Sequence, residues 1–263
     1  MNMTEKNKHG LSRTIPGPVK RIIRQRCGFG CVICGLGFYD YEHFDPDFAD
    51  ATEHNPEGMT LLCSQCNQSR GRGRLSRETV AKANKNPKCL REGYANEMFD
   101  FHSEPIEIKF AGVSFYDCNH LIVVNDKPIL SVSPPKDELS PVLLSGIFCG
   151  PDGSDSLIIN ENEWLVKSDN WDVECEGPNI TIRSKHRKID LVIKLDPPRG
   201  IIIERIDMLF DGVMFRGNEQ VLEICMDGTH WQKWFGCSMS HCHIGICIDT
   251  RPKAANDPVW DVA

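Results

Sequence analysis

The chain has 263 residues, 40% of them hydrophobic, and a formal net charge of −7. This length and composition suffice for one or two packed cores, which excludes a disordered protein. The sequence has no stretch of about eighteen apolar residues, and residues 1–9 lack the apolar run of a signal peptide. We therefore expect a soluble intracellular protein that does not span a membrane.

The chain contains thirteen cysteines, an odd number, and several of them stand in apolar, strand-like runs. This usage indicates reduced thiols together with a bound metal, because disulfide frameworks are typical of short secreted chains with an even cysteine count. Reduced thiols predict a cytoplasmic location.

The charge is divided unevenly along the chain. Residues 1–95 carry 15 Lys and Arg against 10 Asp and Glu, a charge of +5, whereas residues 96–263 carry 15 against 27, a charge of −12. Such a division predicts that a polyanion meets the N-terminal half. The acidic half is expected to face away from it.

The first predicted element is a short helix. Residues 1–13 are polar and expected to be frayed, and apolar residues with helical spacing follow between Pro16 and Gly28. A solvated basic face and a contact with a nucleic-acid backbone are both consistent with the remaining positions. These basic positions are Lys20, Arg21, Arg24 and Arg26. Lys20 and Arg24 are the candidate DNA contacts among them.

The next fifty residues predict the order strand, loop, strand, helix. A tight knuckle near residue 31 leads into a strand through His43, and residues 45–59 are rich in loop-forming residues. Residues 60–62 predict a second strand, and residues 63–70 one or two helical turns. Ser76 is then expected to cap another helix that ends before Pro87, and residues 89–97 show no periodicity.

From Phe99 onward, alternating apolar residues separated by turn residues predict an all-β region. The fold class is therefore α+β, with an N-terminal domain over residues 1–96 and a β-rich domain over residues 97–263. The pattern Phe-x-Gly-Val-x-Phe occurs at 110–115 and again at 210–215, which either an internal duplication or chance similarity between two hairpins explains. The clearest strands are 106–110, 180–183, 191–195 and 201–204.

Two Cys-x-x-Cys knuckles, separated by 28 residues, predict a zinc site. Four thiolates can surround Zn²⁺ tetrahedrally, and a site closed in this way is structural because it leaves no open position for catalysis. Four buried or redox-active thiols are the alternative. Cys27 has a looser spacing and receives no role. The ligands are Cys31, Cys34, Cys63 and Cys66.

Over about residues 20–75 the chain resembles the HNH endonuclease family. The resemblance rests on the adjacent Glu42 and His43, which match an acidic-histidine pair on the family's first strand, and on the second knuckle followed directly by Asn67. It implies a ββα-metal fold stapled by a four-cysteine zinc site. It also implies that His43 is the general base and that Glu42 and Asn67 hold a catalytic divalent ion.

The chemistry of these residue types supports that interpretation. Phosphodiester hydrolysis needs an activated water and a counter-charge for the phosphate, which an imidazole and a divalent ion supply. A hard cation such as Mg²⁺ or Mn²⁺ prefers the oxygen ligands of a carboxylate and an amide. A hydrogen-bonded loop histidine and a helix cap are the alternatives for His43 and Asn67.

The sequence departs from the family at two positions. The family's middle Asn, which orients the loop that carries the base, is replaced by Gly58, and Glu42 stands where Asp is more frequent. His54 and Asn55 are the candidates to substitute for the middle Asn from the same loop.

Four arginines with interleaved glycines follow the predicted nuclease helix. Arginine suits bidentate phosphate contacts, and glycine lets the backbone approach closely, so we interpret this run as a DNA-backbone contact and not as a solvated tail. No residue type here indicates recognition of bases. The arginines are Arg70, Arg72, Arg74 and Arg77.

Two further groups of residues receive a structural interpretation. Cys237, Cys242 and Cys247, with the nearby His241 and His243, lack metal-knuckle spacing, so buried thiols on a strand are expected. Four tryptophans are expected in cores or interfaces and not in a base-stacking platform, since the surrounding charge is acidic. These are Trp164, Trp171, Trp231 and Trp234.

The sequence thus predicts an endonuclease that hydrolyses DNA with a structural Zn²⁺ and a catalytic Mg²⁺ or Mn²⁺. The β-rich domain is expected to bind a partner, sense a ligand or make a homo-oligomer. There are two alternatives. The first is a zinc-dependent nucleic-acid-binding protein in which Gly58 marks the loss of catalytic activity, and the second is an interaction adaptor.

Overall fold

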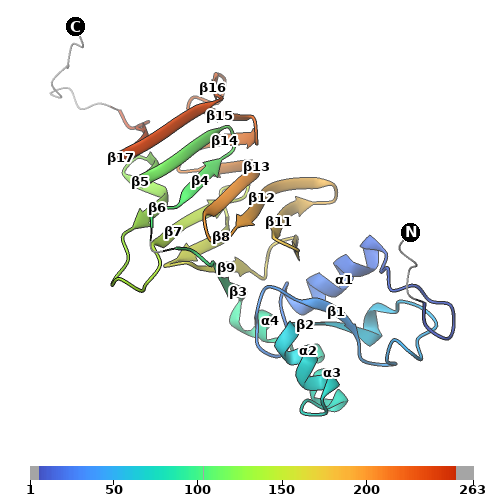
Figure 1. Cartoon of the computed structure of the whole chain (residues 1–263). Helices are drawn as coiled ribbons and strands as arrows, with labels where there is room; N and C mark the ends of the chain where they lie inside the picture. Colours follow the sequence, from blue (N-terminus) through green and yellow to red (C-terminus); the bar gives the residue numbers. More distant parts are fainter. Residues whose placement is uncertain (1–5, 103, 253–263) are drawn as a thin grey trace, which may run out of the picture.

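The computed structural model describes residues 6–102 and 104–252. Figure 1 shows a mainly helical N-terminal region beside a large β domain. None of the helices in these two ranges is long and apolar enough to cross a membrane.

The N-terminal region begins with helix α1 (Gly17–Cys27), as predicted. Prolines start this helix, and Gly28 ends it in the left-handed conformation with φ 71°. Strands β1 (Asp40–His43) and β2 (Met59–Leu62) then pair antiparallel, with His43 opposite Met59. The loop between them includes one turn of 3-10 helix, η1 (Pro56–Gly58).

Helix α2 (Ser64–Gly71) follows β2 directly, so the predicted order of strand, loop, strand and helix is confirmed. Helix α3 (Arg77–Lys85) starts at Ser76, whose hydroxyl accepts a hydrogen bond from the backbone N–H of Thr79 at 3.1 Å. A short helix α4 (Lys88–Glu92) and strand β3 (Tyr94–Met98) come next. These two elements occupy the stretch in which the sequence showed no periodicity.

The β domain consists of strands β3 to β17, which hydrogen-bond into one continuous sheet of 15 strands. Two pairings are parallel, β4 with β13 and β5 with β17, and the others are antiparallel. The strands after β3 are β4 (Glu107–Phe110), β5 (Val113–Val124), β6 (Lys127–Ser133), β7 (Leu143–Cys149), β8 (Asp155–Asn160), β9 (Glu163–Lys167), β10 (Asp172–Glu176), β11 (Asn179–Lys185), β12 (Lys188–Asp196), β13 (Gly200–Phe210), β14 (Val213–Asn218), β15 (Val221–Cys225), β16 (Trp231–Trp234) and β17 (Cys237–Ile248).

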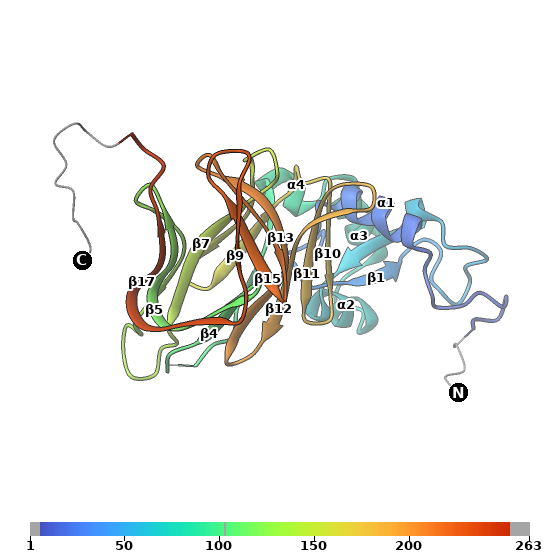
Figure 2. The same ribbon diagram turned by 90° about the horizontal axis from the view of Figure 1, so that it is seen from above.

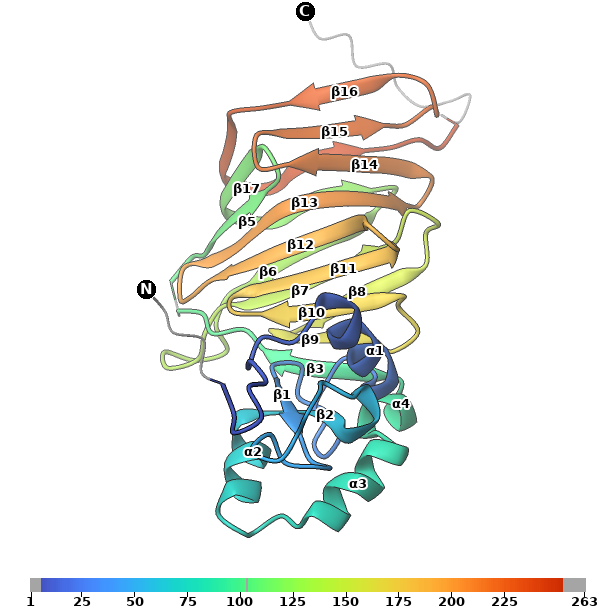
Figure 3. The ribbon, with the colours of Figure 1, turned by 90° about the vertical axis from the view of Figure 1, so that its right-hand side faces the viewer.

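The continuous sheet folds over into two layers. Strands β10 to β16 form one layer and β5 to β9 with β3 and β17 form the other, while β4 joins them by pairing with both β5 and β13 (Figures 2 and 3). The alternating apolar residues point between the layers and make an extended core, in which the rings of Phe110 and Phe148 stack with centroids 6.1 Å apart. Trp164 is fully buried there, as expected for a core tryptophan.

The repeated Phe-x-Gly-Val-x-Phe pattern corresponds to two similar hairpins. The first copy joins β4 to β5, where Phe110 pairs with Val113, and the second joins β13 to β14, where Phe210 pairs with Val213. Both turns contain a non-glycine residue at positive φ, since Ala111 has φ 52° and Asp211 has φ 47°. The repeated pattern therefore specifies the same local turn twice.

The predicted domain boundary falls inside a strand. Strand β3 starts at Tyr94, pairs with β9 along one edge, and forms an isolated bridge between Asn96 and Leu36 of the first cysteine knuckle along the other. The chain therefore enters the β domain before residue 97, and the knuckle extends the edge of the sheet.

The expectation that the N-terminal residues are frayed is wrong for residues 6–13. The side chain of Asn7 donates hydrogen bonds to the carbonyl oxygens of Phe48 and Ala51 at 2.6 and 2.7 Å, which fastens this segment to the β1–β2 loop. Residues 1–5 lie outside the described residues.

Part of the acidic domain lies against the basic helix. Helix α1 lies against β10 at the end of one layer (Figure 3), where Arg24 forms two 2.8 Å hydrogen bonds with the carboxylate of Asp172. Arg24 also donates to Glu174 at 2.7 Å and to the hydroxyl of Tyr41 on β1 at 2.8 Å. Charge complementarity between the two halves therefore docks the N-terminal region on the β domain.

Candidate metal centre and active site

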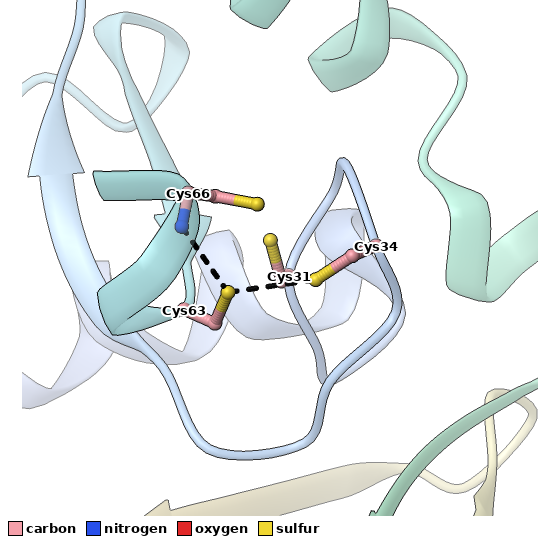
Figure 4. A group of neighbouring side chains, drawn as sticks. All are labelled: Cys31, Cys34, Cys63 and Cys66. Carbon is pink, nitrogen blue, oxygen red and sulfur yellow. Dashed lines mark hydrogen bonds between the residues drawn. The ribbon is translucent and has the colours of Figure 1, made fainter. Parts of the chain in front are cut away.

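The four predicted zinc ligands lie together at the junction of the first knuckle and α2. The sulfur atoms of Cys31, Cys34, Cys63 and Cys66 all lie within 4.8 Å of one another, and Figure 4 shows the two pairs facing each other. A tetrahedral site with bonds of about 2.3 Å places its sulfurs about 3.8 Å apart. The cluster can therefore bind a metal such as zinc.

The local structure fixes each pair of thiols. In the first knuckle the backbone N–H of Gly35 donates to the carbonyl of Cys31 at 2.8 Å, and in the second the sulfur of Cys63 caps α2 by accepting from the N–H of Cys66 at 3.4 Å. In the absence of a cation, a hydrogen bond from Cys34 lowers the pKa of Cys31 to about 5, whereas burial and the neighbouring thiols raise the pKa of Cys66 to about 12. A bound cation would stabilise the thiolate forms that metal ligation requires.

Glu42 and Asn67, the predicted ligands of the second ion, are in contact. The side-chain amide of Asn67 on α2 donates to the carboxylate of Glu42 on β1 at 2.5 Å. Burial raises the pKa of Glu42, and the hydrogen bond from Asn67 opposes that rise. A half-buried carboxylate suits a hard divalent cation, which would restore the charged form, and the amide oxygen of Asn67 is a second ligand atom on a side chain that contacts it.

His43 lies next to Glu42 in the chain and is only 8% exposed. Its ring packs against those of Phe48 and His54, with centroids 5.4 and 5.2 Å away. Burial, together with the electrostatic influence of His54 and Arg13, lowers the pKa of His43 to about 4. The imidazole is therefore neutral near pH 7, the form that a general base requires.

The structure distinguishes between the two candidates for the missing middle Asn. Nδ1 of His54 lies 3.2 Å from Nε2 of His43, whereas the side chain of Asn55 accepts a hydrogen bond from the backbone of Glu57 and caps η1. His54 is thus in contact with the candidate base, and Asn55 serves the local turn.

Gly58 is required by the backbone around it. A Cβ atom at this position would lie 2.0 Å from the carbonyl oxygen of Asp45, so an asparagine cannot occupy it without moving the loop. The carbonyl of Gly58 accepts hydrogen bonds from the N–H groups of Phe44 and Asp45 at 2.9 and 3.2 Å. The backbone of Gly58 therefore holds the segment that follows His43.

Glu42 and His43 line an open cleft of about 380 Å³. On its other wall, Asp47 forms ion pairs with Arg70 and with Arg77, the latter at 2.8 Å. No motif indicated a role for Asp47, which stands in a loop rich in acidic residues and has no motif spacing. Its carboxylate orients Arg70 and Arg77, two of the arginines predicted to contact phosphate, at the cleft.

The remaining basic candidates have different surroundings. Arg72 and Arg74 are exposed in the turn between α2 and α3. Lys20 lines a second hollow of about 440 Å³ on which Glu42 and His43 also border, and its ammonium lies 3.3 Å from Glu176. The prediction that Arg24 contacts DNA is wrong, because this residue is 2% exposed and its guanidinium is bound by Asp172, Glu174 and Tyr41.

The cysteines and histidines near the end of the chain do not add a second metal cluster. They lie on β17, which confirms the predicted strand, but the expectation of buried thiols is wrong, because Cys237 and Cys242 are half-buried and Cys247 is exposed. Among the described residues, the four-cysteine group alone brings together enough side chains to hold a metal ion. Trp171 stacks with Arg21 of α1, with the guanidinium carbon 4.9 Å from the ring centroid, and so belongs to the contact between the two halves. Trp231 stacks in the same way with Arg216.

Comparison of the chain with known proteins gave no match to a family model, to a curated protein or to a solved structure.

Proposed function

We propose that this protein is an HNH-type endonuclease, which hydrolyses DNA phosphodiester bonds with His43 as general base. The observation that carries the proposal is the meeting of three side chains from separate elements: Glu42 and Asn67 are in hydrogen-bond contact, and a neutral His43 borders the same cleft as Glu42. The resemblance of residues 20–75 to the family motif involves these same three residues.

Each group has a distinct task in this proposal. His43 accepts the proton of the attacking water, because its imidazole is neutral and largely shielded from solvent. Glu42 and Asn67 would hold the divalent ion, which supplies the counter-charge for the scissile phosphate. The four-cysteine site has no open position and serves to fix α2, and hence Asn67, against β1.

The rim of the cleft offers contacts for the DNA backbone. Arg70 and Arg77 are oriented by Asp47, and the exposed Arg72 and Arg74 extend the positive surface from the turn that follows α2. Guanidinium groups held in place by a carboxylate can still donate their remaining N–H groups to phosphate oxygens.

Cleavage of plasmid DNA tests this proposal. The zinc-loaded protein with added Mg²⁺ or Mn²⁺ is expected to nick or linearise the plasmid, and His43→Ala should lower the rate by about 10²- to 10⁴-fold. The matched control is His230→Ala, since this side chain is 87% exposed on the β domain. Equal cutting by wild type and His43→Ala, or no cutting by either, contradicts the mechanism.

Glu42→Gln and Asn67→Ala test the catalytic ion without a chelator, which would also remove the structural zinc. Both variants should keep one zinc per chain and should need a higher concentration of Mg²⁺ for half-maximal cleavage. A protein that binds DNA in a salt-dependent manner and never cuts it would instead be a binding protein that lacks activity.

A further inference from the structure

A chain of hydrogen bonds runs from the Ser12 carbonyl through His54 to the candidate base, His43. Nε2 of His54 lies 2.9 Å from the carbonyl oxygen of Ser12, and Nδ1 of His54 lies 3.2 Å from Nε2 of His43. Ser12 belongs to the N-terminal segment, His54 to the β1–β2 loop and His43 to the end of β1. The three residues are distant in sequence and meet only in the folded protein.

The chemistry of the three groups assigns the direction of each hydrogen bond. A carbonyl oxygen can only accept, so Nε2 of His54 carries the proton that it donates to Ser12. A neutral imidazole with a proton on Nε2 has its lone pair on Nδ1, and this lone pair requires a donor at His43. His43 must therefore carry its proton on Nε2 and its lone pair on Nδ1.

We infer that His54 is a positioning residue, which, together with the Ser12 carbonyl, holds His43 in the tautomer with a free Nδ1 lone pair. Within the described ranges, the only hydrogen bond of the His43 ring is the one to His54. Nδ1 is therefore available to accept a proton. The catalytic meaning of this tautomer rests on the proposed function, whereas the tautomer itself does not.

The N-terminal segment is fastened so that the Ser12 carbonyl stays in place. Asn7 donates to the carbonyls of Phe48 and Ala51, and its own side-chain oxygen accepts from the N–H of Leu11 at 3.0 Å. The guanidinium of Arg13 lies over the ring of Phe48, 4.5 Å from its centroid, and Phe48 packs on His43. The β1–β2 loop thus supplies both the carbonyl oxygens that fasten the N-terminal segment and the Phe48 ring that contacts His43.

Nitrogen-15 NMR of the full-length, zinc-loaded protein with labelled histidines tests the inference directly. In the wild type, His43, assigned by the signals lost in His43→Ala, should show a protonated Nε2 and an unprotonated Nδ1 near neutral pH. In His54→Ala this separation should be lost as the two nitrogens move toward the averaged shifts of mixed tautomers. His54→Gln should preserve the separation, because its amide oxygen can accept the His43 proton.

His9→Ala is the matched control, since His9 is exposed in the same N-terminal segment. It should leave the His43 signals unchanged. A proton on Nδ1 of His43 in the wild type, as an imidazolium at His54 would impose, overturns the inference, and so do unchanged His43 shifts in both His54 variants.

Cleavage kinetics separate this inference from the proposed function. His54→Ala is expected to lower kcat with little change in KM, and His54→Gln to restore part of the loss. A wild-type protein with the stated tautomer that does not cut DNA would refute the nuclease proposal and leave the positioning of His43 intact. Cleavage that depends on His43 in a protein without the stated tautomer would support the nuclease proposal and refute the positioning role of His54.

Discussion

The β domain and the N-terminal region are stabilised by different means. In the β domain, apolar side chains from both layers form an extended core that includes Trp164, Phe115 and Phe215, each at most 1% exposed. The N-terminal region has a much smaller cluster of buried residues, and the candidate zinc ligands Cys31 and Cys63 are part of it. A small core of this kind needs additional support from a metal or from a neighbouring domain.

The molecule has a candidate for the first support and a direct example of the second. The four-cysteine cluster joins the first knuckle to α2, and the buried pair of Arg24 and Asp172 joins α1 to β10. Asp172 is completely buried and also lies 3.3 Å from Arg183 of its own domain. The acidic β domain thus acts as the docking surface of the basic helix, and Lys20, Arg21 and Arg24 form their ion pairs within the molecule.

Loss of the metal should have the largest effect. Cys63→Ser is expected to unfold the N-terminal region while the β domain keeps its strands, because structural zinc contributes about 10–16 kcal/mol in small zinc domains. Zinc analysis together with limited proteolysis should show loss of the metal and cleavage confined to residues before β3. Cys247→Ser is the control, since this thiol is exposed on β17. Full retention of zinc and of protease resistance by Cys63→Ser would remove the four-cysteine assignment.

Breaking the buried ion pair should have the next largest effect. Asp172→Ala leaves the guanidinium of Arg24 without its main partner, which should lower the free energy of unfolding by about 3–5 kcal/mol. Denaturant titration measures this loss, and it should fall mainly on the transition of the N-terminal region. Asp196→Ala removes an exposed pair with Arg199 and should cost about 1 kcal/mol or less. Similar losses for both variants would contradict the docking role of Asp172.

The cap of α3 should contribute less. Ser76→Ala removes the oxygen that accepts from the N–H of Thr79, and the N-terminal region should lose about 1 kcal/mol in thermal or denaturant unfolding. Ser240→Ala, an exposed substitution on β17, serves as the comparison within the β domain. An equal effect of the two changes would mean that the cap does not limit the stability of the small region.

Acidification should have the smallest effect on the proposed reaction. Because the pKa of His43 is lowered to about 4, the base stays neutral as the pH falls from 7 to 5, and the cleavage rate should change less than about twofold from its titration. An enzyme whose base had the ordinary histidine pKa of about 6.5 would lose about 25-fold in rate over the same range. Zinc content must be checked at both pH values, because protonation of the cysteines releases the metal.

The local features of the protein follow from short stretches of its amino-acid sequence. The two Cys-x-x-Cys spacings, the cap at Ser76, the stop at Gly28 and the alternation of the strands were each readable from a few neighbouring residues, and the structure confirms them. Short-range geometry decides such features, since turns, caps and knuckles close within about four residues.

Contacts between groups distant in the sequence follow instead from the packing of the whole fold. The burial of Arg24 by Asp172, the contact of His54 with His43, the ion pairs of Asp47 and the fastening of residues 6–13 join positions that no local pattern connects. Arg24 illustrates the reason, because a basic residue that contacts DNA and one that contacts an acidic strand occur at the same spacing on a helix. Which of the two contacts forms depends on the element that packs against the helix. That element is determined by long-range contacts in the fold and not by the periodicity of the helix.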